Sequence, residues 1–398
     1  MFWIHSPRTI VFGENAVMEV SKYAESPILI VTGGRRTREI VSKMVEPVLE
    51  ERGFDYQVVG IPSGEPNMEV VEELSKQMIK YSPKTILAVG GGSVIDAAKA
   101  SWIFYEHPEL EVVSELRRFY ENPFTLPTLR SKALLIAAET TSGTGSGVSR
   151  AAVIRDDERR VKMPILDYKL CPDVAIFDPQ LTITMPKDIT AYSGMDALTH
   201  AIEAYVGIKN NDFAEYCAIR AVDIAVENLP KAYANGDNLE ARKMMHLANM
   251  YAGLAFSQKG TGLAHSISHV LGARYGYPHG LLNASLLPYV IDFNAISAEE
   301  KYAEIATIIG LEASTMEDLI VELIFYLNRL NERLAIPSID DLLEKHEDDL
   351  NRNIDDIVRD IMRDPTIRSN PRKPSIEDLK KLLRSAAEGE FNFYSLTM

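Results

Sequence analysis

Residues 84–105, KTILAVGGGSVIDAAKASWIFY, contain the strongest indication of the fold. The segment 84–89 is a short apolar run, which is typical of a buried strand, and a helical pattern follows Gly90-Gly91-Gly92-Ser93. A glycine run between a strand and a helix lets backbone amides approach an anion, and the helix dipole favours negative charge there. The stretch therefore predicts a phosphate-binding turn in an α/β domain, although such glycines could also form a tight turn without a ligand.

Similar strand and helix patterns surround this stretch. Four further segments predict strands, at residues 27–32, 54–59, 133–138 and 173–178, with helices at 37–52 and 65–81. Strands that alternate with helices indicate a parallel sheet covered on both faces. A second small-residue loop, ETTSGTGSGVS, follows the strand at 133–138. Neither loop matches the common G-x-G-x-x-G or P-loop motifs, but two such loops in one sheet favour a dinucleotide at the carboxyl ends of the strands.

The second half of the chain is different. From Pro186 onward, strand patterns fade and long helical periodicities take over. We therefore predict an α/β nucleotide-binding domain at residues 1–185 and an all-helical domain at residues 186–398.

Histidines in this second half have the spacing of metal ligands. In GLAHSISHVLGARYGYPHGLLNASLL, residues 262–287, His265 and His269 share one helix face, and a loop could return His279 towards them. Asp196 and His200 are also four residues apart. Histidines that pack in a core without a metal remain the alternative, but two pairs with this spacing favour a divalent metal.

Composition excludes several classes of protein. The 398 residues are 46% hydrophobic and 25% charged, which is typical of a globular protein with two domains. No apolar run reaches the length of a membrane span and no signal-peptide core is visible, so we expect a cytoplasmic protein with no membrane partner. A net charge of -15 argues against a nucleic-acid partner. Cys171 and Cys217 are too few for a disulfide framework.

Four segments together resemble the iron-containing (group III) alcohol dehydrogenases: GGGSVIDAAK, TTSGTGS, GMDALTHAIEAY and GLAHSISHVLGARYGYPHGLLNASLLP. Their order and spacing agree with that family, as do PRTIVFGENAV near the N-terminus and Asn370-Pro371-Arg372 near the C-terminus. The resemblance implies the dehydroquinate synthase-like fold of the family, with an α/β dinucleotide-binding domain followed by an all-α metal-binding domain. It also implies a homodimer.

The resemblance assigns roles to individual residues. It implies that the metal ligands are Asp196, His200, His265 and His279. His269 matches the histidine of the family that is not a ligand, and we regard it as the candidate proton relay; Phe256 matches a substrate-pocket aromatic residue. The cofactor-binding residues predicted in the loops or by the resemblance are Asn67, Gly91, Gly92, Ser93, Asp96, Thr140, Thr141, Thr144, Ser146 and Lys162.

Some positions depart from the pattern of the family. Many NAD-preferring members have an aspartate after the first long strand, whereas here Thr32 is followed by Gly33-Gly34-Arg35-Arg36. Gly33 removes the carboxylate that would repel a 2′-phosphate, and Arg35 adds a guanidinium that can bind it. These residues predict a preference for NADP(H) over NAD(H), as in the butanol dehydrogenase-like branch. Further departures are Gly147, where many members have glutamate, Ser266 and Ser268, where alanine is common, and Lys259.

We therefore expect an alcohol dehydrogenase or aldehyde reductase that transfers a hydride between NADP(H) and a small primary alcohol or aldehyde. The resemblance favours Fe²⁺ as the metal, with Zn²⁺ as the alternative, because the ligand types suit both. The competing interpretations are a zinc-dependent glycerol or polyol dehydrogenase of the same fold, a metal-dependent lyase, and a nucleotide-binding protein without turnover.

Overall fold

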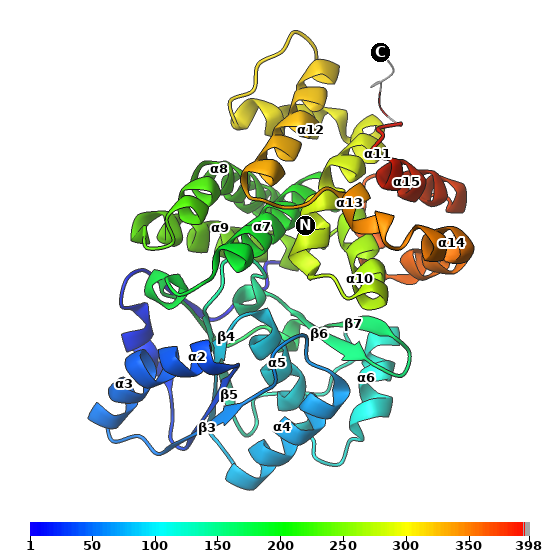
Figure 1. The fold of residues 1–398 in the computed structure, drawn as a ribbon. Helices are drawn as coiled ribbons and strands as arrows, with labels where there is room; N and C mark the ends of the chain where they lie inside the picture. The colour runs from blue at the N-terminus through cyan, green and yellow to red at the C-terminus, as the bar shows by residue number, and fades with distance from the viewer. Residues whose placement is uncertain (393, 395–398) are drawn as a thin grey trace.

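The computed structural model of the protein describes residues 1–392 and 394. Figure 1 shows two halves, an N-terminal one built around a sheet (blue through cyan to the first green) and a C-terminal one made of helices (green to red). The predicted fold class, a parallel-sheet domain followed by a helical one, is confirmed.

The main sheet has six parallel strands in the order β1-β8-β5-β4-β2-β3. The strands are β1 (Thr9–Phe12), β2 (Ile28–Thr32), β3 (Tyr56–Gly60), β4 (Thr85–Gly90), β5 (Leu134–Glu139) and β8 (Val174–Phe177). Five of them were predicted. The edge strand β1 was missed, as was the antiparallel hairpin of β6 (Ala151–Asp156) and β7 (Val161–Leu166).

Helices cover both faces of the sheet because successive strand residues point to opposite sides. On β2, Leu29 and Val31 pack with α4 (Met68–Tyr81), α5 (Gly92–Glu106) and α6 (Val112–Glu121). Ile28 and Ile30 face the other core, which contains residues of α1 (Val20–Tyr23), α2 (Arg35–Ile40) and α3 (Glu46–Glu51). The helix predicted at residues 37–52 is interrupted, since a π-helical turn at Val41–Val45 joins α2 to α3.

The C-terminal half contains the remaining α-helices: α7 (Lys187–Val206), α8 (Asp212–Ala234), α9 (Leu239–Lys259), α10 (Leu263–Tyr275), α11 (His279–Ile308), α12 (Met316–Arg333), α13 (Ile339–Glu344), α14 (Glu347–Arg363) and α15 (Ile376–Glu388). Among the described residues, α11 alone is long and apolar enough to cross a membrane, but 83% of its most apolar window is buried inside the structure. It is therefore a core helix here.

The small-residue loop ETTSGTGSGVS, residues 139–149, joins the two halves and is called the second glycine loop below. A Cβ atom on Gly143 would lie 2.5 Å from Ser193 of α7, and one on Gly145 would lie 2.6 Å from Gly253 of α9. Gly145 also has a φ of 56°, in the left-handed region that favours glycine. The loop after β5 is thus in direct contact with α7, the helix that carries Asp196 and His200, and with α9, the helix that carries Phe256.

Candidate metal and cofactor site

Donor atoms of Asp196, His265 and His279 converge from three helices. One such atom from each residue lies within 4.8 Å of the other two. Asp196 Oδ1 lies 3.9 Å from His265 Nε2 and 3.7 Å from His279 Nε2. His200, one turn after Asp196 on α7, places its ring centroid 4.4 Å from that of His265. Three of the four predicted ligands thus have converging donor atoms, from α7, α10 and the first residue of α11, and the ring of the fourth, His200, lies beside them.

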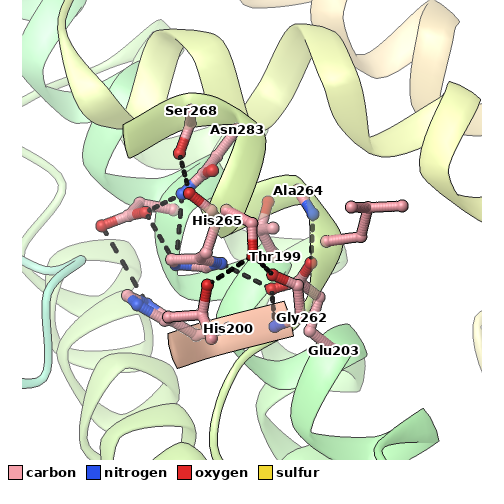
Figure 2. A network of polar contacts seen from close by, with 12 residues as sticks. Thr199, His200, Glu203, Gly262, Ala264, His265, Ser268 and Asn283 are labelled. Carbon is pink, nitrogen blue, oxygen red and sulfur yellow. Dashed lines mark hydrogen bonds and ion pairs between the residues drawn. The ribbon is translucent and has the colours of Figure 1, made fainter. Parts of the chain in front are cut away.

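Hydrogen bonds at Nδ1 orient the three imidazoles, of which Figure 2 labels His200 and His265. His265 Nδ1 lies 2.5 Å from Glu203 Oε2, and His200 Nδ1 lies 3.3 Å from the carbonyl oxygen of Gly143. These oxygens only accept, so Nδ1 carries a proton in both rings. Ser268 Oγ donates to the carbonyl of His265 and lies 3.1 Å from His279 Nδ1, from which it can accept. This arrangement leaves Nε2 for a metal, as is usual for metal-bound histidines.

The electrostatics keep two of these rings neutral. Burial lowers the pKa of His200 to about 4. Burial also lowers the pKa of His279 well below its ordinary value, and neighbouring histidines add to that effect. At His265 burial acts in the same direction, but the carboxylates of Glu203 and Asp196 outweigh it and raise the pKa. Neutral imidazole is the form that binds a metal.

The side-chain amide of Asn283 lies among the donor atoms. Its Nδ2 is 2.8 Å from Asp196 Oδ1 and 3.2 Å from Nε2 of both His265 and His279. Its Oδ1 is buried and has no hydrogen-bond partner in the part of the chain that the structure describes. The donor atoms of Asp196, His265 and His279 therefore surround the positively polarised NH₂ group of Asn283. A divalent cation fits this set of nitrogen and carboxylate donors.

Glu203 was not predicted, although it lies at the heart of this network. It is 3% exposed and accepts hydrogen bonds from the backbone nitrogens of Gly262, at 2.7 Å, and Ala264, at 2.6 Å, as well as from His265. Figure 2 shows it beside the start of α10. Glu203 thus holds the N-terminus of α10 and orients a donor histidine. Its spacing of three residues from His200 on one helix face was the available signal.

His269 and Phe256 lie next to the donor cluster. The His269 ring stacks on His279 with centroids 5.0 Å apart, and its Nδ1 lies 2.8 Å from Asp364 Oδ2. The Phe256 ring, from α9, stacks on His200 at 4.3 Å. Both side chains therefore border the imidazoles of the donor cluster.

A cavity of about 610 Å³ lies at the carboxyl ends of the strands. Its lining residues are Gly34, Arg35, Arg36, Thr37, Glu39, Ile40, Ser63, Gly91, Thr140, Thr141, Thr184, Met185 and Ile189. Four residues predicted to bind the cofactor are among them. The buried Oγ1 of Thr141 has no partner among the described residues, so a hydroxyl is available there for a ligand.

The two glycine loops pack against each other beside this cavity. A Cβ atom on Gly92 would lie 2.7 Å from the Thr144 side chain, and one on Gly91 would lie 3.1 Å from Thr141. Gly91 is the N-cap of α5 and Gly92 its first residue, followed by Ser93. The resulting cradle of backbone amides at a helix N-terminus suits a phosphate.

Asp96 and Ser146 bond to each other. The Ser146 hydroxyl donates to Asp96 Oδ1 at 2.5 Å, while Asp96 Oδ2 accepts from the backbone nitrogen of Val153. The fully buried Lys99, which was not predicted, donates to three carbonyl oxygens of the same loop region, those of Ser146, Ser149 and Ala151. Asp96, Ser146 and Lys99 therefore set the conformation of the second glycine loop.

Glu139 also holds this loop. Its Oε1 accepts from the backbone nitrogen of Gly147 at 2.6 Å, and its Oε2 accepts from Asn249 Nδ2 at 2.7 Å. Asn249 Oδ1 in turn accepts from the Gly145 nitrogen. A Cβ atom on Gly147 would lie 2.8 Å from Glu139 Oε1, so Gly147 leaves room for this carboxylate. Burial raises the pKa of Glu139 to about 7.

The other predicted cofactor residues have different surroundings. Asn67 caps α4 and donates to Asp157 at 2.7 Å, and it lines a separate cavity of about 370 Å³. The Lys162 ammonium, on β7, lies 2.5 Å from Glu65 Oε1. Arg35 is 93% exposed at its side chain and pairs with Glu39 one turn later.

Gly33 packs closely against its neighbours, since a Cβ atom there would lie 3.0 Å from Thr37 Oγ1.

Lys259 lies outside the site. It is fully buried and donates to Glu215 and to the carbonyl of Tyr205, and Lys301 donates to the same two groups.

Comparisons with known proteins agree with this architecture. Residues 7–179 match the family model described as iron-containing alcohol dehydrogenase, and residues 190–387 match the C-terminal model of the Fe-containing alcohol dehydrogenase family. The NADPH-dependent butanol dehydrogenase of Clostridium saccharobutylicum is 38% identical over 385 residues, which cover 96% of this chain and 97% of that protein.

Two further relatives are similar over nearly the whole chain. The bifunctional aldehyde-alcohol dehydrogenase AdhE of Escherichia coli is 35% identical over 98% of this chain, which corresponds to 47% of that longer protein. The structure of an iron-containing alcohol dehydrogenase from Thermococcus thioreducens superimposes with a TM-score of 0.87 and 35% identity, and the match covers 98% of this chain and 100% of that one.

Proposed function

Because the chain belongs to the family of iron-containing alcohol dehydrogenases, we propose that it transfers a hydride between NADP(H) and a small primary alcohol or aldehyde, with Fe²⁺ as the metal. The observation that carries this proposal is the convergence of Asp196, His265 and His279 donor atoms, with Asp196 on the same helix, α7, that contributes Ile189 to a nucleotide-sized cavity. The chain is an oxidoreductase of the alcohol dehydrogenase type, and the comparisons do not favour a polyol dehydrogenase.

In this proposal each group of residues has one task. Asp196, His200, His265 and His279 hold the metal, which when bound supplies a Lewis acid for the substrate oxygen. The amides at Gly91 and Gly92 hold the pyrophosphate, and hydroxyls of the second loop contact the rest of the cofactor. Phe256 forms an apolar wall, and His269 exchanges a proton with the substrate oxygen.

Arginines beside the cavity support the preference for NADP(H). Arg35 and Arg36 both line it, and no acidic residue follows β2 directly. A guanidinium can bind a 2′-phosphate through two hydrogen bonds, whereas a carboxylate there would repel it. The similarity to an NADPH-dependent butanol dehydrogenase points in the same direction.

We also propose the domain division at residues 1–185 and 186–398, a cytoplasmic location and a homodimer. The change from sheet to helices between β8 and α7 supports the division, and the two buried free cysteines agree with a reducing compartment.

The test is the initial rate of butyraldehyde reduction by enzyme stripped with a chelator and reloaded anaerobically with Fe²⁺ or Zn²⁺. We expect activity that depends on the metal and is higher with NADPH than with NADH. Arg35→Glu should reduce the preference for NADPH, and Lys22→Glu, a charge reversal at an exposed residue of α1, serves as the control. Activity that survives complete removal of the metal would refute the metal assignment, and equal efficiency with both cofactors would refute the NADP(H) preference.

A further inference from the structure

A buried carboxylate from a distant segment engages the candidate proton relay. Asp364 follows the last residue of α14, and its Oδ2 lies 2.8 Å from His269 Nδ1. Both residues are nearly inaccessible, with Asp364 5% and His269 6% exposed. We propose that Asp364 is a positioning residue that holds His269 as the tautomer with hydrogen on Nδ1. This inference rests on the proposed function, because it concerns how His269 serves the reaction.

The hydrogen bonds around Asp364 fix the direction of this contact. Oδ1 accepts from both the backbone nitrogen and the hydroxyl of Thr366, at 2.9 Å and 2.5 Å. The Thr366 hydroxyl also lies 2.7 Å from Ser266 Oγ on α10, the helix that carries His269. One carboxylate oxygen is thus held by the chain that follows α14, and the other is left for the imidazole. A carboxylate oxygen only accepts, so the bond places the hydrogen on Nδ1.

Fixing the tautomer leaves His269 Nε2 for proton exchange. The ring also stacks on His279, so its plane is set by packing as well as by the carboxylate. A bound nicotinamide would supply the hydride for the new C–H bond as the C=O π bond breaks. His269 Nε2 takes a proton from solvent and gives it to the substrate oxygen. Throughout this exchange Nδ1 keeps its hydrogen bond to Asp364, as in the histidine and aspartate pairs of other enzymes.

Asp364→Asn is the direct variant. The new amide can still accept from Thr366, but its NH₂ group faces His269 Nδ1 and turns the ring to the other tautomer. The equivalent change in a serine protease lowers kcat about 10⁴-fold. Here we expect kcat to fall about 100-fold or more, while the metal content, the KM for aldehyde and the Kd for NADPH stay within about twofold. Asp360→Asn, at an exposed residue one turn earlier on α14, is the matched control and should retain wild-type kcat.

Nitrogen NMR of zinc-loaded, ¹⁵N-histidine-labelled protein provides a test that does not need turnover. The His269 signals, assigned by their loss in His269→Ala, should show hydrogen on Nδ1 in the wild type and on Nε2 in Asp364→Asn. In the His269→Ala background, Asp364→Asn should slow the reaction less than twofold further.

Hydrogen on Nε2 in the wild type, wild-type kcat in Asp364→Asn, or an undiminished effect without His269 would each overturn the proposal. If the wild-type enzyme does not reduce aldehydes, the proposed function fails, whereas the NMR measurement still decides whether Asp364 sets the tautomer.

Discussion

Replacing Glu203 by glutamine should weaken both metal binding and the folded state. The carboxylate accepts three hydrogen bonds, from the backbone nitrogens of Gly262 and Ala264 and from His265 Nδ1. Glutamine keeps one acceptor oxygen and turns the other into a donor. If the oxygen stays with Gly262 and His265, the NH₂ group faces the Ala264 N–H. The variant then loses one bond to a charged group, about 1.5–3 kcal/mol, and leaves a buried donor unpaired, about 1–3 kcal/mol.

We therefore expect Glu203→Gln to lower the free energy of unfolding of the metal-free protein by about 2.5–6 kcal/mol. That is a large part of the total of about 5–15 kcal/mol typical of a folded domain. His265 also loses the charged partner that makes it a better ligand, and removal of such a partner weakens metal binding about 10–100-fold.

Urea unfolding of the metal-free protein measures the first quantity, and competition with a chelator for Zn²⁺ measures the second. Asp188→Asn, an exposed acidic residue in the first turn of the same helix, is the control and should change neither value. If Glu203→Gln retains wild-type affinity for Zn²⁺, then Glu203 does not support the donor histidine and the interpretation of this network is wrong.

Three further predictions concern other buried groups. The pKa of Glu139 rises from its ordinary value of 4.5 to about 7 on folding. As the pH rises from 4.5 to 7, the wild type should therefore lose about 3 kcal/mol of stability relative to Glu139→Gln, as urea titrations at several pH values would show. Burial lowers the pKa of Lys259 from 10.5 to about 8, so the wild type should gain up to about 3 kcal/mol of stability relative to Lys259→Met as the pH rises from 8 to 10.5. At pH 7 the variant should be at least as stable as the wild type, because Lys301 still donates to Glu215; a variant destabilised at pH 7 would show that Lys301 does not replace Lys259. Ser268→Ala removes the acceptor for His279 Nδ1 and should lower Zn²⁺ affinity about 10-fold in calorimetric titration, so an unchanged affinity would mean that this hydroxyl does not orient the ring.

The sequence indicated most of the sheet because strands buried on both faces are continuous apolar runs. The edge strand Thr9–Phe12 escaped detection because it is only four residues long and half-buried throughout. Residues 151–166 form a separate antiparallel hairpin in which polar and apolar residues are mixed, so they lack the continuous apolar run of a strand in the main sheet.

The site could be predicted where partners lie on one helix. Helical spacing brings Asp196 beside His200, but the contact of His269 with Asp364 joins residues 95 positions apart. No local pattern encodes that pairing, because it depends on how α14 packs against α10. Lys99 was hidden for a different reason: it lies in a helix whose other residues are almost all apolar or small, and only its acceptors in the second glycine loop explain its burial.

The contacts of Gly143 with Ser193 and of Gly145 with Gly253 leave no room for a side chain at either glycine. The loop that follows β5, whose Thr140 and Thr141 line the nucleotide cavity, is therefore packed directly against α7, the helix that carries Asp196 and His200. We therefore expect variation in the range of substrates to arise elsewhere, for example at Phe256, because a side chain added at Gly143 or Gly145 would push this loop away from α7 and α9.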